Sequence, residues 1–221
     1  MGYLITIEGA DGTGKSTVMA AIREYFADRG VEIVASREPG GVPISEEIRS
    51  ILLRNEFTEM DARTEALLFA AARRQHFVEK MLPVLNDNRV MVLDRFLDSS
   101  IAYQGFARGI GAAEIEKIND FALEGFRPDL TILLDMDVDQ ALARIARNPE
   151  REVNKLDLEK RDFHLKVREG YLKIASMPSN FSRIRIVDAS LSPDAVAAQV
   201  VKILDEKVDF SLLSGENSGM R

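Results

Sequence analysis

The sequence predicts an α/β protein in which a doubly wound, parallel five-stranded sheet is flanked by helices. Short apolar runs alternate along the chain with segments of helical periodicity, and this order builds a parallel sheet. The runs are nearly continuous rather than alternating, as in strands that are covered on both faces. The predicted strands are residues 3–7, 32–36, 90–93, 130–134 and 184–187.

The segments between and after these strands have the apolar spacing of helices. Ser192 and Pro193 mark one helix start, because serine is a favoured N-cap and proline fits the first helical turn. The predicted helices are approximately residues 15–29, 44–53, 61–86, 112–124, 137–147, 156–177 and 193–208. We expect a single domain over residues 1–208 and a disordered tail over residues 209–221, which is rich in serine and glycine.

The composition argues against several classes of function. The 221 residues carry a net charge of −7, which disfavours a general nucleic-acid binder. The chain has neither a basic leader nor an apolar stretch near the roughly 20 residues that span a membrane. Cysteine is absent, so the chain offers no disulfide framework and no thiol metal site. We therefore expect a cytoplasmic protein that binds neither nucleic acid nor membranes.

The most specific pattern is the run Gly-Ala-Asp-Gly-Thr-Gly-Lys-Ser-Thr, which fits the phosphate-binding loop G-x-x-x-x-G-K-[ST]. A strand is predicted before it and a helix after it, so glycines, inward N–H groups and the helix dipole can cradle phosphates. Lys15 can bridge the β- and γ-phosphates, and the Ser16 hydroxyl can hold Mg²⁺. The alternative is a plain glycine-rich turn. The expected nucleotide-binding residues are Gly9, Ala10, Asp11, Gly12, Thr13, Gly14, Lys15, Ser16 and Thr17.

Polar clusters follow the first three predicted strands. They are the phosphate loop, the sequence Arg-Glu-Pro-Gly-Gly at residues 37–41, and the pair Asp94 and Arg95. Ligands of doubly wound sheets bind outside the carboxyl ends of the strands, so these clusters predict one binding edge. Asp94 can reach Mg²⁺ or its waters there, although it could simply cap a turn. Arg95 suits a phosphate, because its planar fork binds two oxygens and stays charged.

Four arginines, Arg37, Arg49, Arg73 and Arg95, are candidates for one electropositive basin. Two phosphorylated substrates repel each other, and such a basin would hold them together. No residue stands out as a catalytic base, and a phosphate acceptor needs none because its second pKa is near 6. Positioning and charge neutralisation can then supply most of the catalysis.

Other residues are candidates for reading a nucleobase. Phe69 and Arg73 are four residues apart on one helix face, so they could stack on a base and bond its edge. The spacing alone favours a core position for Phe69. Gln104 could read a base edge with paired donor and acceptor, and Tyr103 could pack on a sugar. Their segment, residues 99–105, could equally be a simple helical turn.

The charged stretch from Arg144 to Arg161 follows a helix that Asn148 and Pro149 should break. Charge runs are usually solvated surfaces, but a flexible basic stretch that faces a phosphate site can also be a lid. We place such a lid at about residues 148–160. The two histidines lack matching ligands, so no zinc site is predicted.

These motifs together resemble those of bacterial thymidylate kinases, which phosphorylate dTMP with ATP and so supply dTTP synthesis. The resemblance covers nearly the whole chain, through residues 8–17, 37–41, 69–73, 94–96 and 99–105. It implies the P-loop fold of nucleoside monophosphate kinases, ATP and Mg²⁺ as cofactors, and a homodimer formed by helix packing. The alternatives are a kinase for another nucleoside monophosphate and a nucleotide-dependent switch without acceptor chemistry.

The resemblance also implies roles for the matched residues. Phe69 would stack on thymine, contrary to the core position that spacing favours, while Arg73 and Gln104 would read its polar edge. Tyr103 would occupy the place of a ribose 2′-hydroxyl and favour a deoxy sugar. The residues implied in dTMP binding are Asp11, Arg37, Glu38, Arg49, Phe69, Arg73, Arg95, Ser100, Tyr103 and Gln104. Ser16 and Asp94 are the residues expected at the metal.

Catalysis is expected from Lys15, Arg95 and a cation of the lid. Some family members carry a basic residue inside the phosphate loop, but this chain has Gly12 at that position. The missing cation should then come from Arg151 or Lys155. Lys155 stands where the family usually has arginine, and an ammonium lacks the fork of a guanidinium.

Overall fold

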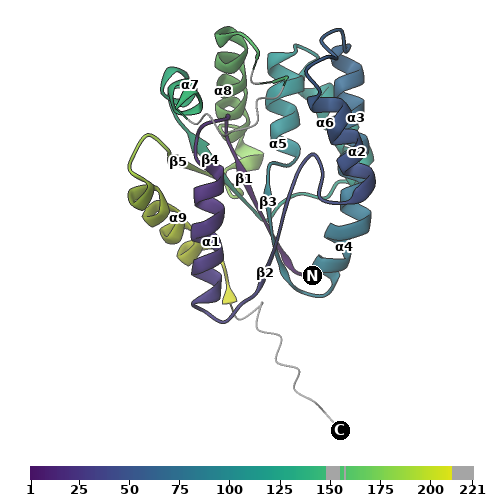
Figure 1. The fold of residues 1–221 in the computed structure, drawn as a ribbon. Coiled ribbons are helices and arrows are strands. Elements are labelled where there is room, and N and C mark those ends of the chain that lie inside the picture. The colour runs from purple at the N-terminus through teal and green to yellow at the C-terminus, as the bar shows by residue number, and fades with distance from the viewer. Residues whose placement is uncertain (148–154, 157, 211–221) are drawn as a thin grey trace.

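A computed structural model describes residues 1–147, 155–156 and 158–210 of the chain. Its centre is one sheet of parallel strands in the order β2-β3-β1-β4-β5, with helices on both faces (Figure 1). The strands are β1 (Tyr3–Glu8), β2 (Ile33–Arg37), β3 (Val90–Asp94), β4 (Leu130–Asp135) and β5 (Ile184–Asp188). The predicted doubly wound sheet is confirmed, and each strand end lies within one residue of its prediction.

The helices fall largely where periodicity predicts them. The predicted helix over 61–86 is one continuous rod whose middle widens into a π-helical turn, and residues 97–107 form a short helix and a second π turn. The helix predicted from residue 156 starts only at Arg161, which corrects that boundary. The helices are α1 (Lys15–Ala27), α2 (Pro43–Leu53), α3 (Ala62–His76), η1 (Phe77–Met81), α4 (Leu82–Asn86), α5 (Leu97–Ser100), η2 (Ile101–Ala107), α6 (Ala112–Leu123), α7 (Val138–Ala146), α8 (Arg161–Ala175), η3 (Pro178–Asn180) and α9 (Pro193–Lys207).

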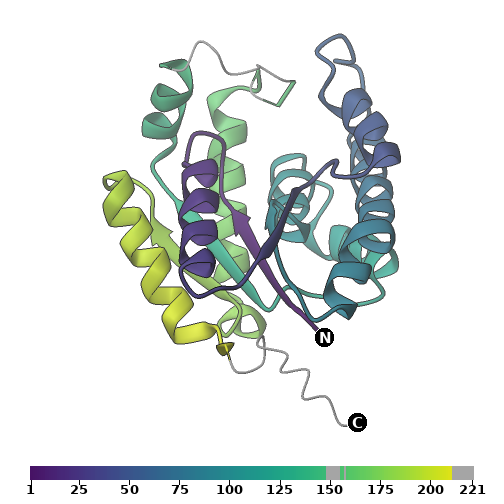
Figure 2. The same ribbon diagram turned by 60° about the horizontal axis from the view of Figure 1, so that its bottom comes forward.

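Two apolar layers hold the helices to the sheet. Alternate residues of β1 divide between the layers: Leu4 packs with α3, α6 and α8, whereas Ile5 packs with α1 and α9. Figure 2 shows α1 beside α9 on one face of the sheet, opposite the larger group of helices. Every strand is therefore covered on at least part of both faces, which explains the continuous apolar runs.

The topology places the predicted polar clusters at one edge. β1 lies between β3 and β4, so the chain diverges to both sides at the carboxyl end of β1. Asp94 at the end of β3 pairs in register with Ile7 of β1 and with Arg37 of β2. A doubly wound sheet binds its ligands at such a switch point. None of the helices in the described ranges has the length and apolar character of a membrane span.

Candidate active site

A cleft of about 790 Å³ opens where these strands end. It contains most of the predicted site residues, including all four arginines of the predicted basin. Gly9, Ala10, Thr13, Thr17 and Lys155 do not line it, and Arg151 lies outside the described residues. The predicted residues that line the cleft are Asp11, Gly12, Gly14, Lys15, Ser16, Arg37, Glu38, Arg49, Phe69, Arg73, Asp94, Arg95, Ser100, Tyr103 and Gln104.

The phosphate loop is closed and ordered by its own contacts. Lys15 begins α1, and its buried Nζ donates to the carbonyls of Gly9 and Ala10 at 3.2 and 3.1 Å. Burial lowers the pKa of this ammonium, and the nearby charge of Arg95 lowers it further. Gly12 has φ +81°, and a Cβ there would lie 2.4 Å from the Ala141 carbonyl oxygen of α7. A basic side chain at this loop position would therefore require the loop and α7 to separate.

Asp11 joins the phosphate loop to the arginine that follows β3. Its Oδ1 lies 4.0 Å from Lys15 Nζ and 3.0 Å from Arg95 Nη2. The Tyr103 hydroxyl donates to the other carboxylate oxygen at 3.2 Å. One carboxylate thus holds two cations near each other, as a site for two phosphate groups requires.

Arg95 is fixed by contacts from several elements. Its backbone is left-handed, with φ +67°, and its side chain is only 17% exposed. Besides Asp11, its guanidinium donates to the hydroxyls of Ser99, Tyr103 and Tyr171, each at 3.2 Å. The fork is therefore oriented in advance toward the cleft, which lowers the entropy lost when it binds a phosphate.

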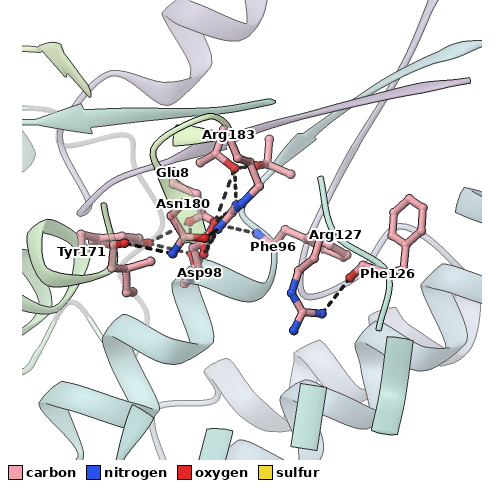
Figure 3. A network of polar contacts seen from close by, with 12 residues as sticks. Glu8, Phe96, Asp98, Phe126, Arg127, Tyr171, Asn180 and Arg183 are labelled. Atoms are coloured by element: carbon pink, nitrogen blue, oxygen red, sulfur yellow. Dashed lines mark hydrogen bonds and ion pairs between the residues drawn. The ribbon is translucent and has the colours of Figure 1, made fainter. Parts of the chain in front are cut away.

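Glu8, the last residue of β1, lies with Phe96 and Tyr171 in a polar network that the sequence did not predict (Figure 3). Glu8 accepts the Phe96 N–H at 2.8 Å and the Tyr171 hydroxyl at 2.9 Å, and the Ser99 hydroxyl also donates to it. Burial raises the pKa of Glu8 to about 7, and the neighbouring charge of Asp98 raises it as well. Its position before the loop was the available signal for Glu8, whereas nothing in the sequence marked Tyr171.

At the opposite end of the cleft, Phe69 is half-buried in the wall and belongs to neither apolar layer. The core position that spacing favoured is therefore wrong. Arg73 on the next turn of α3 is 2% exposed, and its Nε donates to Glu38 at 2.7 Å. It also donates to the Ser100 hydroxyl and to the Phe96 carbonyl, both at 3.0 Å. Asn119 also accepts a hydrogen bond from Arg73, so protein groups bind four of its five N–H donors and hold the guanidinium rigidly in the wall of the cleft.

The remaining basin residues are held at the rim or behind it. Arg37 is half-exposed and lies 3.0 Å from Glu46 Oε2, while Arg49 donates to the Pro39 carbonyl at 2.9 Å. Glu38 is buried between Arg73 and His76, and its Oε1 lies 3.1 Å from the Nδ1 atom of His76. The structure thus gives Glu38 a clear support role for Arg73.

Lys155 lies against α2 and α3, outside the lining of the cleft. Its Nζ is buried, 3.7 Å from Glu65 Oε2, and its backbone N–H donates to the Leu53 carbonyl at 3.4 Å. The other candidate, Arg151, and most of the predicted lid fall in the segments 148–154 and 157, outside the described residues. The source of the lid cation therefore stays a prediction.

The oxygen donors near the phosphate loop fit Mg²⁺. Asp94 Oδ1 is buried and has no hydrogen-bond partner among the described residues, and the exposed Ser16 lies in the first turn of α1. Both residues line the cleft. No cluster of three histidine or carboxylate ligands occurs in the described ranges. Mg²⁺ that binds together with nucleotide phosphates takes only one or two protein ligands, so this donor set is sufficient.

A phosphate loop that faces an arginine-rich pocket with an aromatic wall defines a P-loop phosphotransferase that acts on a nucleotide. The family model described as thymidylate kinase matches residues 7–200 of the chain. The chain therefore belongs to the thymidylate kinase family.

Curated relatives and a solved structure agree with this assignment. The chain is 50% identical over 210 residues to the thymidylate kinase of Geobacillus thermodenitrificans, covering 95% of this chain and 92% of the relative. It is 49% identical over 199 residues to that of Clostridium novyi, with 90% and 96% covered. The crystal structure of thymidylate kinase from Ehrlichia chaffeensis superposes with a TM-score of 0.73 at 31% identity, covering 92% and 98% of the two chains.

Proposed function

We propose that the cleft holds ATP at the phosphate loop and dTMP between Phe69 and Arg95, and that the two meet beside Asp11. Family membership assigns the reaction, in which ATP phosphorylates dTMP to give ADP and dTDP. The observation that carries the division of the cleft is the carboxylate of Asp11, 4.0 Å from Lys15 and 3.0 Å from Arg95. This contact brings the donor loop and the acceptor arginine into one site.

In this mechanism an oxygen of the dTMP phosphate attacks the γ-phosphorus of ATP. A new P–O bond forms as the bond to the β,γ-bridging oxygen breaks, and the electron pair leaves with ADP. The acceptor phosphate is already ionised at neutral pH, so no residue has to remove a proton. Lys15 exchanges its two carbonyl partners for phosphate oxygens, and Arg95 neutralises the acceptor. Mg²⁺ held by Ser16 and Asp94 would offset further phosphate charge when bound.

The base end supports thymine recognition by stacking and hydrogen bonding. Phe69 offers a ring in the wall of the cleft, and Arg73, which also lines the cleft one helical turn away, would donate to the edge of the base. Tyr103, whose hydroxyl is engaged by Asp11 and Arg95, would crowd a ribose 2′-hydroxyl and so favour a deoxy sugar.

We also propose a homodimer that forms on the side of α3 and α6. Phe121 of α6 is 90% exposed and Leu67 of α3 is 58% exposed, which is unusual for such large apolar side chains. The two helices pack against each other at the margin of the fold (Figure 1). We further propose that the protein is cytoplasmic, where ATP and dTMP are available. The proposal also includes a single domain over residues 1–208 and a lid near residues 148–160.

An acceptor panel tests the proposed function. ADP release is measured with dTMP, dUMP, dCMP, dGMP and the thymine ribonucleotide, and dTMP should give the highest kcat/KM. The variant Arg95→Ala should bind ATP normally and lose at least about a hundredfold in turnover with dTMP, as for other transition-state charge contacts. A preference for dCMP or dGMP would refute the thymine site, and a preference for the ribonucleotide would refute the role proposed for Tyr103. ATP hydrolysis without dTDP would favour a nucleotide-dependent switch.

A further inference from the structure

The two ends of the Gln104 amide have different surroundings. Gln104 lies in η2, is fully buried and lines the cleft at its base end. Its Nε2 donates to Glu65 Oε1 at 2.9 Å. Its Oε1 is also buried, yet it has no hydrogen-bond partner in the part of the chain that the structure describes. A buried acceptor without a partner is destabilising unless a ligand supplies a donor.

The chemistry of Glu65 dictates this orientation. Glu65 lies in α3, is 2% exposed and does not line the cleft. Arg108 binds both carboxylate oxygens, with Nε and Nη2 each at 3.1 Å, and Lys155 Nζ is 3.7 Å away. Both carboxylate oxygens accept hydrogen bonds from Arg108, so this salt bridge offers Gln104 an acceptor and no donor. The reversed amide would place oxygen against oxygen, and therefore the Nε2 end must face Glu65.

We propose that Glu65 is a specificity-determining residue, which acts through Gln104 to present an acceptor oxygen to the base. This proposal rests on the proposed function of the cleft. Thymine carries a hydrogen at N3 and can donate to Gln104 Oε1. Cytosine has a lone pair at N3, which would face the lone pairs of that oxygen. Glu65 should thus allow the site to discriminate thymine from cytosine. It should not affect discrimination between thymine and uracil, because uracil carries the same N3–H.

The variant Glu65→Gln tests this role, because its amide can donate to Gln104 Oε1 and so permits the reversed orientation. We expect the ratio of kcat/KM for dTMP over dCMP to fall at least about tenfold, the value of roughly one hydrogen bond. The ratio for dTMP over dUMP should change less than about twofold, and the KM for ATP should stay constant. Equal losses with dTMP and dCMP would overturn the proposal.

Two controls separate orientation from general damage to the cluster. Arg108→Gln removes the same Arg108–Glu65 ion pair that Glu65→Gln removes, but it leaves Glu65 as an acceptor, so the dTMP over dCMP ratio should persist. Glu65→Asp keeps the carboxylate and should also preserve the ratio, even if the overall rate falls. Relaxed discrimination in either control equal to that of Glu65→Gln would contradict the proposal.

A double variant tests whether Glu65 acts through Gln104. In the background Gln104→Met no amide remains to be oriented, so adding Glu65→Gln should leave the dTMP over dCMP ratio unchanged. A further loss of discrimination in that background would refute the positioning role. Failure of the unmodified chain to phosphorylate dTMP at all would instead refute the proposed function, so the two failures are distinguishable.

Discussion

The pKa of Glu8 makes the stability of the fold depend on pH. Burial, with a further contribution from the charge of Asp98, raises this pKa from its ordinary 4.5 to about 7. The folded state therefore holds a proton that the unfolded chain releases at lower pH. The stabilisation is complete below the ordinary pKa and is lost as the pH rises through about 7. The difference between the two pKa values corresponds to about 3 kcal/mol of unfolding free energy.

Glu8→Gln should remove this dependence while keeping the network. The Gln carbonyl can accept the N–H groups of Phe96 and Ser99, and its NH₂ can donate to the hydroxyls of Ser99 and Tyr171. Denaturant unfolding at several values from about pH 5 to about pH 8 would measure the free energy of both proteins. The variant should gain up to about 3 kcal/mol relative to the unmodified chain toward the alkaline end.

The control is Glu114→Gln, which changes the same atoms in an exposed residue of α6. Its unfolding free energy should follow that of the unmodified chain at each pH, because surface substitutions rarely exceed about 0.5 kcal/mol. If the unfolding free energy of Glu8→Gln also runs parallel to that of the unmodified chain across the whole pH range, Glu8 does not hold a proton in the folded state, and the prediction is refuted.

Three further changes probe other parts of the molecule. Phe69→Ala should raise the KM for dTMP by about tenfold or more through lost stacking, with the KM for ATP unchanged in steady-state assays. Gly41→Ala should lower the unfolding free energy by about 1–3 kcal/mol in denaturant titrations. Gly41 has φ +88°, and a Cβ there would lie 2.5 Å from Ser36 Oγ and 2.8 Å from His76 Nε2. Phe121→Asp should shift the chain from dimer to monomer in analytical ultracentrifugation, and an unchanged mass would contradict the proposed interface.

The parts of the fold that short-range patterns encode were predictable. The strands are continuous apolar runs because both faces of the sheet are covered, and the phosphate loop is a contiguous motif between a strand and a helix. The start of α8 was misplaced at Leu156, because apolar spacing alone did not mark where the helix begins.

The support behind the site could not be read from the sequence. Tyr171 contacts Glu8 across 163 residues, and a single chain carries no signal for such a contact. Glu65 lies in a helical pattern, where a carboxylate usually marks a surface position. It is nevertheless buried, and it pairs with Arg108, the residue directly after η2. Phe69 shows the opposite case, since its neighbours are apolar but its ring lines a cavity.

In the proposed arrangement of the cleft, the end of β1 sets the spacing between ATP and dTMP. Glu8, which supports the acceptor side through Ser99 and Tyr171, is followed directly by the loop that ends in Lys15 on the donor side. The separation of the two phosphate-binding regions is thus a property of eight consecutive residues anchored to the middle strand of the sheet. An insertion or deletion in this stretch would change the distance over which the phosphoryl group travels, even if every side chain were retained.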